Sequence, residues 1–439
     1  ENGRDLWEDA LARTSMALSV STLTDVDADP VVDRGRVFAL GQGGRMASYE
    51  LVTGQRSWEI SIAGISTPYV VGEWVYVMTD DGKLLCVARA TGKVGVVFAT
   101  SGPGATNLVT GISTAYTDSV PLVCITGQVA NSYIGKDSFQ EADVCGITTP
   151  ITKHNYLVKK VEDLPRVLKE AFYIARTGRP GPVVVDVAKD VFDTKLDYAY
   201  PESVHLRGYS GENIGDEREI DAVVEAIRSA KKPLVFAGGG VILSETAGVL
   251  QDIVRRLGAP STATLLGLGA IPADEKGFLS FAGMHGSYGA NMAIQECDLL
   301  LCIGMRFSDR VTGKVSEFAP HAKIVHFEID RAELNKNVAA DYRVLGDLSW
   351  SLPILRDKLA ACPDDFAAKF SPWLAHALEL EAKHPFGYRE EGDAIKPGAL
   401  ISKVSSLMGR DAIGVTDVGQ HQMWAAQFFK VYKPRHFLT

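Results

Sequence analysis

The sequence predicts an α/β protein with doubly wound parallel sheets, preceded by a short antiparallel all-β segment. Residues 1–92 contain short apolar runs separated by polar turns rich in Gly and Asp, which is typical of antiparallel strands. From about Gly95, buried strands such as 122–126 alternate with amphipathic helices such as 164–174. Because alternating strands and helices favour parallel sheets with covered faces, we expect α/β domains in this part of the chain.

Composition and charge narrow the classes of function. The chain has 439 residues, of which 46% are hydrophobic and 23% charged, as in a soluble globular protein of several domains. The net charge of -9 argues against nucleic-acid binding. We see no membrane-spanning run and no targeting leader, so we expect a cytoplasmic protein. The six cysteines never form a C-x-x-C pair and the nine histidines show no ligand spacing, so no metal-binding residue is predicted.

An internal repeat runs through the all-β segment. Gly44 recurs 38 positions later as Gly82, and each unit contains a strand, a Gly turn, a strand and a Thr-Gly turn. Such tight reversals are what the blade of a β-propeller needs. The stretches 49–58 and 85–93 resemble quinoprotein-type propeller repeats, most closely those of the lipoprotein in the outer-membrane assembly machinery. About two blades are present, whereas a closed propeller needs several.

A glycine-rich turn at 99–107 (Ala-Thr-Ser-Gly-Pro-Gly-Ala-Thr-Asn) follows a predicted strand. Such a turn lets a ligand approach the backbone at a helix N-terminus, although a tight packing turn has the same composition. Further motifs follow in order at 125–129, 137–141, 151–156, 178–182, 238–240, 283–286, 304–310, 328–330, 346–347 and 417–424. From about Ala88 to Thr439 this ordered set resembles the catalytic subunit of acetolactate (acetohydroxyacid) synthase.

The resemblance, together with the change of sequence style, divides the chain into six expected segments. The polar stretch 193–215 is interpreted as an interdomain linker. The segments are propeller-like repeats at 1–92, a partial pyrimidine-binding-type α/β domain at 93–192, the linker at 193–215, a central FAD-binding-type α/β domain at 216–355, a helical linker at 356–395 and the start of a truncated diphosphate-binding domain at 396–439.

The resemblance implies FAD, which this family binds in its middle domain as a largely structural cofactor. The residue types suit a nucleotide, because glycines permit close approach, arginines can pair with phosphate and strand-end carboxylates can accept ribose hydroxyls. For Asp309 and Arg310 a surface ion pair is the alternative interpretation. The expected FAD-contacting residues are Arg179, Gly238, Gly239, Met284, His285, Gly286, Asp309, Arg310, Asp330 and Asp347.

The resemblance also places residues near thiamine diphosphate, the cofactor at which this family reacts. Phe139, Gln140 and Lys189 match its substrate channel, where Lys189 would supply positive charge beside a 2-keto carboxylate. A solvated surface lysine is the alternative for Lys189. Gln420 and His421 match the start of the diphosphate-binding region.

Two departures from the family pattern predict that the chain is inactive by itself. Thiamine catalysis needs a carboxylic acid beside the aminopyrimidine ring, and counting along the pattern places that residue at Val77, inside the propeller-like repeat. The Gly-Asp-Gly motif that holds Mg²⁺ in the family is not found, so no metal-binding residue is assigned. We therefore expect a chimeric chain, joined near 88–94, where both resemblances fit.

The resemblance implies a carboligase that decarboxylates pyruvate and joins it to a second 2-keto acid, such as pyruvate or 2-ketobutyrate, in branched-chain amino-acid biosynthesis. It also implies a homo-oligomer and a regulatory subunit. Two alternatives stay open, which are a non-catalytic FAD-binding fragment and a propeller-type scaffold module.

Overall fold

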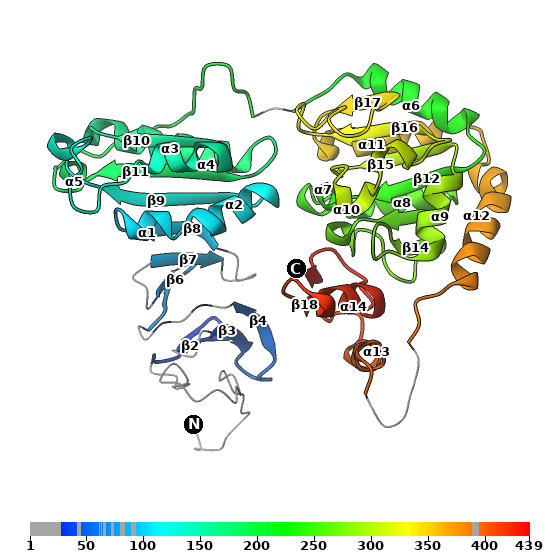
Figure 1. Cartoon of the computed structure of the whole chain (residues 1–439), viewed down its shortest axis with the longest axis horizontal. Coiled ribbons are helices and arrows are strands. Elements are labelled where there is room, and N and C mark those ends of the chain that lie inside the picture. Colours follow the sequence, from blue (N-terminus) through cyan, green and yellow to red (C-terminus); the bar gives the residue numbers. More distant parts are fainter. Residues whose placement is uncertain are drawn as a thin grey trace. The chain divides into compact units, whose positions relative to one another are not determined.

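The computed structural model describes residues 28–41, 45–60, 62, 64, 67–71, 74–79, 84–88, 94–211, 213–388 and 395–439. The chain divides into two compact units, Glu1–Gly211 and Glu212–Thr439, and each is considered by itself (Figure 1). None of the described helices combines the length and the apolar character that crossing a membrane requires.

The first described strands of the first unit form a four-stranded antiparallel meander (Figure 1). Its strands pair in chain order, each with the next. They are β1 (Val31–Asp33), β2 (Arg36–Gly41), β3 (Arg45–Glu50) and β4 (Arg56–Ile60).

A second meander repeats the first along the chain. Three of its strands begin at residues 69, 74 and 94, which is 38 positions after the starts of β1, β2 and β4. Neighbouring strands again pair antiparallel. The strands are β5 (Tyr69–Val71), β6 (Trp74–Met78), β7 (Leu84–Ala88) and β8 (Val94–Ala99).

Strand β8 belongs to two structures at once. On one side it pairs antiparallel with β7, and on the other it pairs parallel with the next strand, β9 (Leu122–Gln128). The sheet then continues through β11 (Pro182–Ala188) to β10 (His154–Val158), which gives the order β10-β11-β9-β8-β7-β6-β5. The propeller-like repeat and the α/β fold therefore share one seven-stranded sheet. The joining stretch 89–93 lies outside the described residues.

Helices cover the α/β part of this sheet on both faces. One core contains Val97, Cys124 and Val184 together with residues of helix α2. Another core contains Val183 and Val185 together with residues of helix α4. The helices are α1 (Pro103–Thr106), α2 (Val109–Thr117), α3 (Val144–Thr148), α4 (Leu164–Arg176) and α5 (Lys189–Phe192).

The two meanders pack against each other through a core of their own. Its fully buried members come from both sheets, and each meander therefore covers one face of the other. They are Phe38, Leu40 and Met46 from the first meander and Val75, Val77 and Val87 from the second.

The second unit contains a six-stranded parallel sheet with the order β14-β13-β12-β15-β16-β17. The chain starts in the middle at β12, moves outward to β14, and returns to build the other half from β15, so the topology switches between β12 and β15. This doubly wound sheet, preceded by antiparallel strands, confirms the predicted fold class. The strands are β12 (Pro233–Ala237), β13 (Ser261–Ala263), β14 (Phe278–Phe281), β15 (Leu299–Ile303), β16 (Lys323–Glu328) and β17 (Tyr342–Leu345).

Two layers of helices bury this sheet. One core includes residues of α6, α8 and α11, and the other includes residues of α9 and α12. The helices are α6 (Glu217–Ser229), α7 (Gly239–Leu243), α8 (Ala247–Leu257), α9 (Tyr288–Glu296), α10 (Asp309–Thr312), α11 (Leu348–Ala361) and α12 (Phe366–Lys383).

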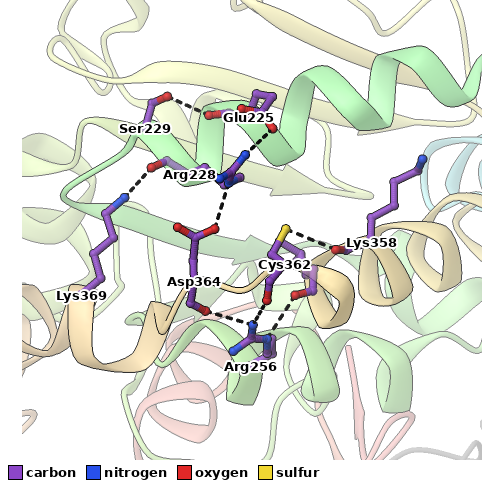
Figure 2. A network of polar contacts seen from close by, with 9 residues as sticks. Glu225, Arg228, Ser229, Arg256, Lys358, Cys362, Asp364 and Lys369 are labelled. Atoms are coloured by element: carbon purple, nitrogen blue, oxygen red, sulfur yellow. Dashed lines mark hydrogen bonds and ion pairs between the residues drawn. The ribbon is translucent and has the colours of Figure 1, made fainter.

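A polar network fastens the connection between α11 and α12 to helices α6 and α8 (Figure 2). The Arg256 guanidinium donates to the carbonyl oxygens of Leu359 (3.1 Å), Cys362 (2.8 Å) and Asp364 (3.0 Å). The Asp364 carboxylate accepts from Arg228 at 2.9 Å. Cys362 and Asp364 follow the end of α11, where the helix offers no amide partner, so the guanidinium supplies donors to their carbonyl oxygens, whereas the Leu359 carbonyl oxygen also accepts from the Cys362 amide at 3.3 Å.

The last part of the chain packs on the same unit. The Ala273 amide donates to the Val431 carbonyl oxygen at 2.9 Å, and Phe281, Val431 and Phe437 share a small core. The elements here are α13 (Pro397–Met408), β18 (Gly414–Val415), α14 (Gln420–Phe428) and β19 (Phe437–Leu438), with β18 parallel to β19.

Candidate functional site

The predicted FAD-contacting residues of the second unit follow the strands of its sheet at their carboxyl ends. Because parallel strands end at the same edge, the fold brings these residues to one side of the sheet, where doubly wound proteins bind ligands. The order is Gly238 and Gly239 after β12, Met284, His285 and Gly286 after β14, Asp309 and Arg310 after β15, Asp330 after β16, and Asp347 after β17.

The glycines at the topological switch are required by packing. A Cβ atom on Gly238 would lie 2.2 Å from the Gly304 carbonyl oxygen, and one on Gly240 would lie 2.8 Å from the Gly304 Cα atom. A Cβ atom on Gly239 would lie 3.3 Å from the Leu266 side chain, which is a milder approach. Gly239 is therefore the glycine here whose small size is least explained by its protein neighbours.

Asp309 and Arg310 are both well exposed, at 79% and 73% of their side-chain surface. The Arg310 Nε atom lies 3.8 Å from Asp309 Oδ2, so the two side chains form a loose surface ion pair, which was the alternative interpretation of these residues. The Arg310 carbonyl oxygen accepts from the Met284 amide at 2.9 Å, which joins the loops after β14 and β15. Long exposed side chains in such a pair can turn toward a ligand at little cost.

Asp330 and Asp347 shape the turns in which they lie. Asp347 caps α11, and its Oδ1 atom accepts from the Ser349 amide at 2.8 Å. Asp330 Oδ1 accepts from the Ala332 amide at 2.9 Å. Each carboxylate is thus held at the strand end by its own backbone, which fixes its position along the edge.

The remaining predicted cofactor residues lie elsewhere. Gln420 and His421 begin α14 and are exposed, and α14 reaches the predicted FAD loop where Gln427 Nε2 donates to the His285 carbonyl oxygen at 3.0 Å. Arg179 belongs to the first unit, where its Nε atom donates to Ser119 Oγ at 2.9 Å.

The first unit contains a cavity of about 880 Å³ beside the carboxyl ends of β8, β9 and β11. Phe139 and Lys189, two of the three predicted substrate-channel residues, line it. Gln140 is not among the lining residues, and its side chain is exposed. Its backbone packs against Gly102, because a Cβ atom on Gly102 would lie 2.7 Å from the Gln140 carbonyl oxygen. Sequence reasoning missed other lining residues, which include Met78, Phe98, Ile125, Val129, Tyr133 and Phe192.

The register of the sheet explains why Met78 lines the cavity and Val77 does not. Met78 pairs with Leu84, Leu84 with Phe98, and Phe98 with Ile125, so Met78, Phe98 and Ile125 lie in one row across the strands and face the same side. Val77 faces the other side and is fully buried in the core between the two meanders. The position where the resemblance expects a catalytic glutamate is therefore turned away from the cavity.

A buried carboxylate supports the rim of the cavity. Asp186 accepts from Thr126 Oγ1 at 2.7 Å and from Gln128 Nε2 at 3.0 Å. Gln128 also donates to the Ala142 carbonyl oxygen at 2.7 Å and accepts from the Val129 amide at 2.8 Å. Burial raises the pKa of the Asp186 carboxyl group to about 6, and its two hydrogen bonds oppose that rise. The sequence signal that could have identified Asp186 is the presence of an acidic residue within the valine-rich strand 182–188.

No cluster of three or more His, Cys, Asp or Glu side chains suited to a metal ion occurs within the part of the chain that the structure describes.

Comparisons with known proteins divide the chain near β8, the strand that the meander and the parallel strands share. Residues 220–355 match the central domain of thiamine pyrophosphate enzymes, and residues 85–147 match their N-terminal TPP binding domain. Residues 1–95 match the family of the outer membrane protein assembly factor BamB. The two matches overlap at residues 85–95, which contain most of β7 and the start of β8.

Curated relatives cover most of the chain. It is 42% identical over 385 residues to the acetolactate synthase isozyme 3 large subunit of Escherichia coli K12, which covers 86% of this chain and 66% of that protein. It is 45% identical over 353 residues to the acetolactate synthase of Mycobacterium leprae, covering 80% and 56%. It is 46% identical over 354 residues to the chloroplastic acetolactate synthase 1 of Nicotiana tabacum, covering 80% and 53%. The chain therefore spans between about half and two thirds of the length of these relatives.

Proposed function

We infer that this chain, which is homologous over most of its length to the large subunits of acetolactate synthase, keeps the nucleotide-binding part of that architecture and does not catalyse carboligation by itself. The observation that carries this proposal is the orientation of β6. The position expected for the activating glutamate is Val77, and its side chain is buried between the two meanders.

The residues present do not fit the requirements of thiamine diphosphate at this position. The cofactor needs a carboxylic acid to activate its aminopyrimidine ring, and the neighbouring residue that faces the cavity, Met78, cannot transfer a proton. By homology, residues from 85 onward derive from a branched-chain carboligase that acts on pyruvate and a second 2-keto acid such as 2-ketobutyrate. Phe139, Gln140 and Lys189 are the residues that would face such a substrate, and Gln420 and His421 those that would face the diphosphate with its Mg²⁺.

The carboxyl edge of the second sheet fits FAD. Gly239 leaves space at the start of α7, Arg310 is exposed and can pair with a phosphate, and Asp330 and Asp347 present carboxylates to ribose hydroxyls. Bound there, FAD would supply a rigid nucleotide that stabilises the central unit, as expected of a structural cofactor.

Two measurements on the purified full chain test the proposal. With pyruvate, thiamine diphosphate, Mg²⁺ and FAD, we expect no acetolactate above background, and measurable turnover would contradict the inactive assignment. Separately, FAD is added, excess is removed, and the retained flavin is read from its absorbance. A preparation that retains no flavin would contradict the nucleotide site.

A matched pair of variants locates the flavin. Arg310→Gln removes the proposed phosphate partner and should weaken FAD binding about tenfold, because a charge-assisted hydrogen bond contributes on the order of 1.5 kcal/mol or more. Arg343→Gln, on an exposed part of β17 in the same unit, is the control and should bind FAD as the parent does.

The two sequence styles support a chimeric origin. The two family matches overlap at residues 85–95, as expected of a junction in a stretch that both patterns fit. Sequencing of a single source transcript or clone across residues 60–120 tests this, because an uninterrupted synthase sequence there would show that the fusion is an artefact.

A second function is favoured by the match of residues 1–95 to an outer membrane assembly factor. The paired meanders would then act as a scaffold module. Retention of a specific partner by the full chain, lost when the meander surface is altered, would support it. Assembly of the synthase-like part into a homo-oligomer, with a regulatory subunit, is expected from the relatives and is tested by the mass of the complex in solution.

A further inference from the structure

The last segment of the chain, residues 396–439, packs beside the edge where the proposed FAD residues lie. A small core of buried side chains joins this segment to the sheet of the second unit. Phe281 belongs to this core and is the last residue of β14, so the core is anchored directly before the loop 283–286, which contains three of the proposed FAD contacts. The buried members of the core are Leu268, Phe281, Ala426, Val431 and Phe437.

Polar contacts join the last segment to two elements of the same edge. From α14, Gln427 Nε2 donates to the His285 carbonyl oxygen at 3.0 Å, within the loop that follows β14. The Arg435 guanidinium pairs with Glu245 at 3.0 Å, just beyond the end of α7, the helix that begins with Gly239. The ion pair is exposed and contributes little by itself, but it places the segment against a second element that carries a proposed FAD residue.

The backbone of the loop after β14 is held residue by residue. The Gly283 amide donates to Asn291 Oδ1 at 2.9 Å, and Asn291 Nδ2 donates to the Gly283 carbonyl oxygen at 3.0 Å. The next amide, that of Met284, donates to the Arg310 carbonyl oxygen at 2.9 Å. The next residue, His285, is held by Gln427. Three consecutive residues are thus fixed by α9, by α10 and by α14.

We propose that residues 396–439 clamp the FAD edge, so that docking of this segment and binding of FAD strengthen each other. Gln427 is the positioning residue, because it acts on the ligand through the backbone of His285. A loop that is already fixed loses less conformational freedom when a ligand binds, and a ligand that favours the fixed loop favours docking of α14 by the same factor. This inference rests on the proposed FAD site and gives α14 a role apart from the diphosphate contacts expected of Gln420 and His421.

The first test needs no cofactor. Hydrogen exchange of the full chain is followed by mass spectrometry over the loop after β14. Gln427→Leu removes the donor and keeps a side chain of similar size, so exchange of the amides of residues 284–286 should become about fivefold faster, as for the loss of one neutral hydrogen bond. Gln295→Leu is the matched control, because Gln295 Nε2 donates to the Glu317 carbonyl oxygen at 3.1 Å in an exposed contact elsewhere on the unit. Its loop should exchange as in the parent.

The second test adds FAD to the same preparations. FAD should slow the exchange of the α14 amides about fivefold, and Gln427→Leu should weaken FAD binding by about the same factor, because the coupling between the two events is reciprocal. Gln295→Leu should bind FAD as the parent does. Urea midpoints measured without FAD should agree among the parent and both variants, which separates positioning of the loop from a general loss of stability.

The possible results separate this proposal from the proposed function. Equal loop exchange in Gln427→Leu and Gln295→Leu would overturn the clamp. FAD binding that leaves the exchange of α14 unchanged would overturn the coupling, and the nucleotide site would stand. A parent that retains no FAD would contradict both the proposed function and the coupling, whereas faster loop exchange in Gln427→Leu would still support the clamp.

Discussion

The two sheets of this molecule differ in where their strands come from. In the second unit all six strands belong to one parallel, doubly wound pattern, and the cofactor residues that the resemblance implies follow the carboxyl ends of these strands. In the first unit three parallel pairings continue into an antiparallel meander of another family. The comparison shows that one sheet can combine parallel and antiparallel pairing, whereas the lining of the cavity depends on which side chain each strand turns toward it.

The largest expected effect tests which face of β6 is buried. Val77→Glu would place a carboxylate in the apolar core between the meanders and should destabilise the chain by about 3 kcal/mol or more, seen as a lower urea midpoint. Met78→Glu, one residue along on the partly exposed cavity face, should cost less than about 1 kcal/mol. Equal effects would show that the orientation of this strand has been misassigned.

The next largest effect tests how much the contacts of the α11–α12 connection contribute to the stability of the second unit. Arg256→Met removes a donor from three carbonyl oxygens around the end of α11 and should cost about 2 kcal/mol of the free energy of unfolding, because the Cys362 and Asp364 oxygens lose this donor. Arg356→Met, on α11 and joined by an ion pair to its exposed neighbour Asp357, is the matched control because it donates to none of these carbonyl oxygens. If both variants unfold at the same urea concentration, the network in Figure 2 does not hold this connection.

The first unit should respond to pH through Asp186. Its pKa is about 6 in the folded chain against an ordinary value of 3.8, so the folded state binds this proton more tightly than the unfolded state. The resulting stabilisation is present at low pH and is lost as the pH rises from about 4 to 6, an effect of about 2–3 kcal/mol. Asp186→Asn should remove that part of the slope of stability against pH, whereas exposed Asp193→Asn should keep it. A parent and an Asp186→Asn variant with identical slopes would contradict the assignment.

The smallest effect concerns a surface contact of the second unit. Lys358 pairs with Glu217 at 2.8 Å and with Asp221 at 2.6 Å, which joins α11 to α6. Lys358→Met should lower the melting temperature slightly in low salt, and the difference should vanish in high salt because exposed pairs are screened. A difference that persists in high salt would mean that the lysine contributes through packing.

The parallel sheet of the second unit could be predicted from the sequence because the signals for it are local. Alternating strands and helices predicted the parallel sheet, and the ordered glycine and Asp/Arg motifs fall at its carboxyl edge. The first unit needed information that no local pattern contains. That Val77 faces the core and Met78 the cavity depends on how two meanders pack and on the register from β6 to β9, which are contacts between distant residues. Asp186 could have been found from an acidic residue in a valine-rich strand, but its partners Thr126 and Gln128 come from another strand.

The double membership of β8 has a consequence for the integrity of the protein. A strand bonded on both edges cannot lose one neighbour without exposing a row of backbone donors and acceptors, which is a template for aggregation. Removing residues before β8 would therefore leave an unpaired strand edge in the remaining sheet, and we expect such a truncated chain to aggregate. We therefore expect the antiparallel meander and the parallel strands that share β8 to unfold as one cooperative unit.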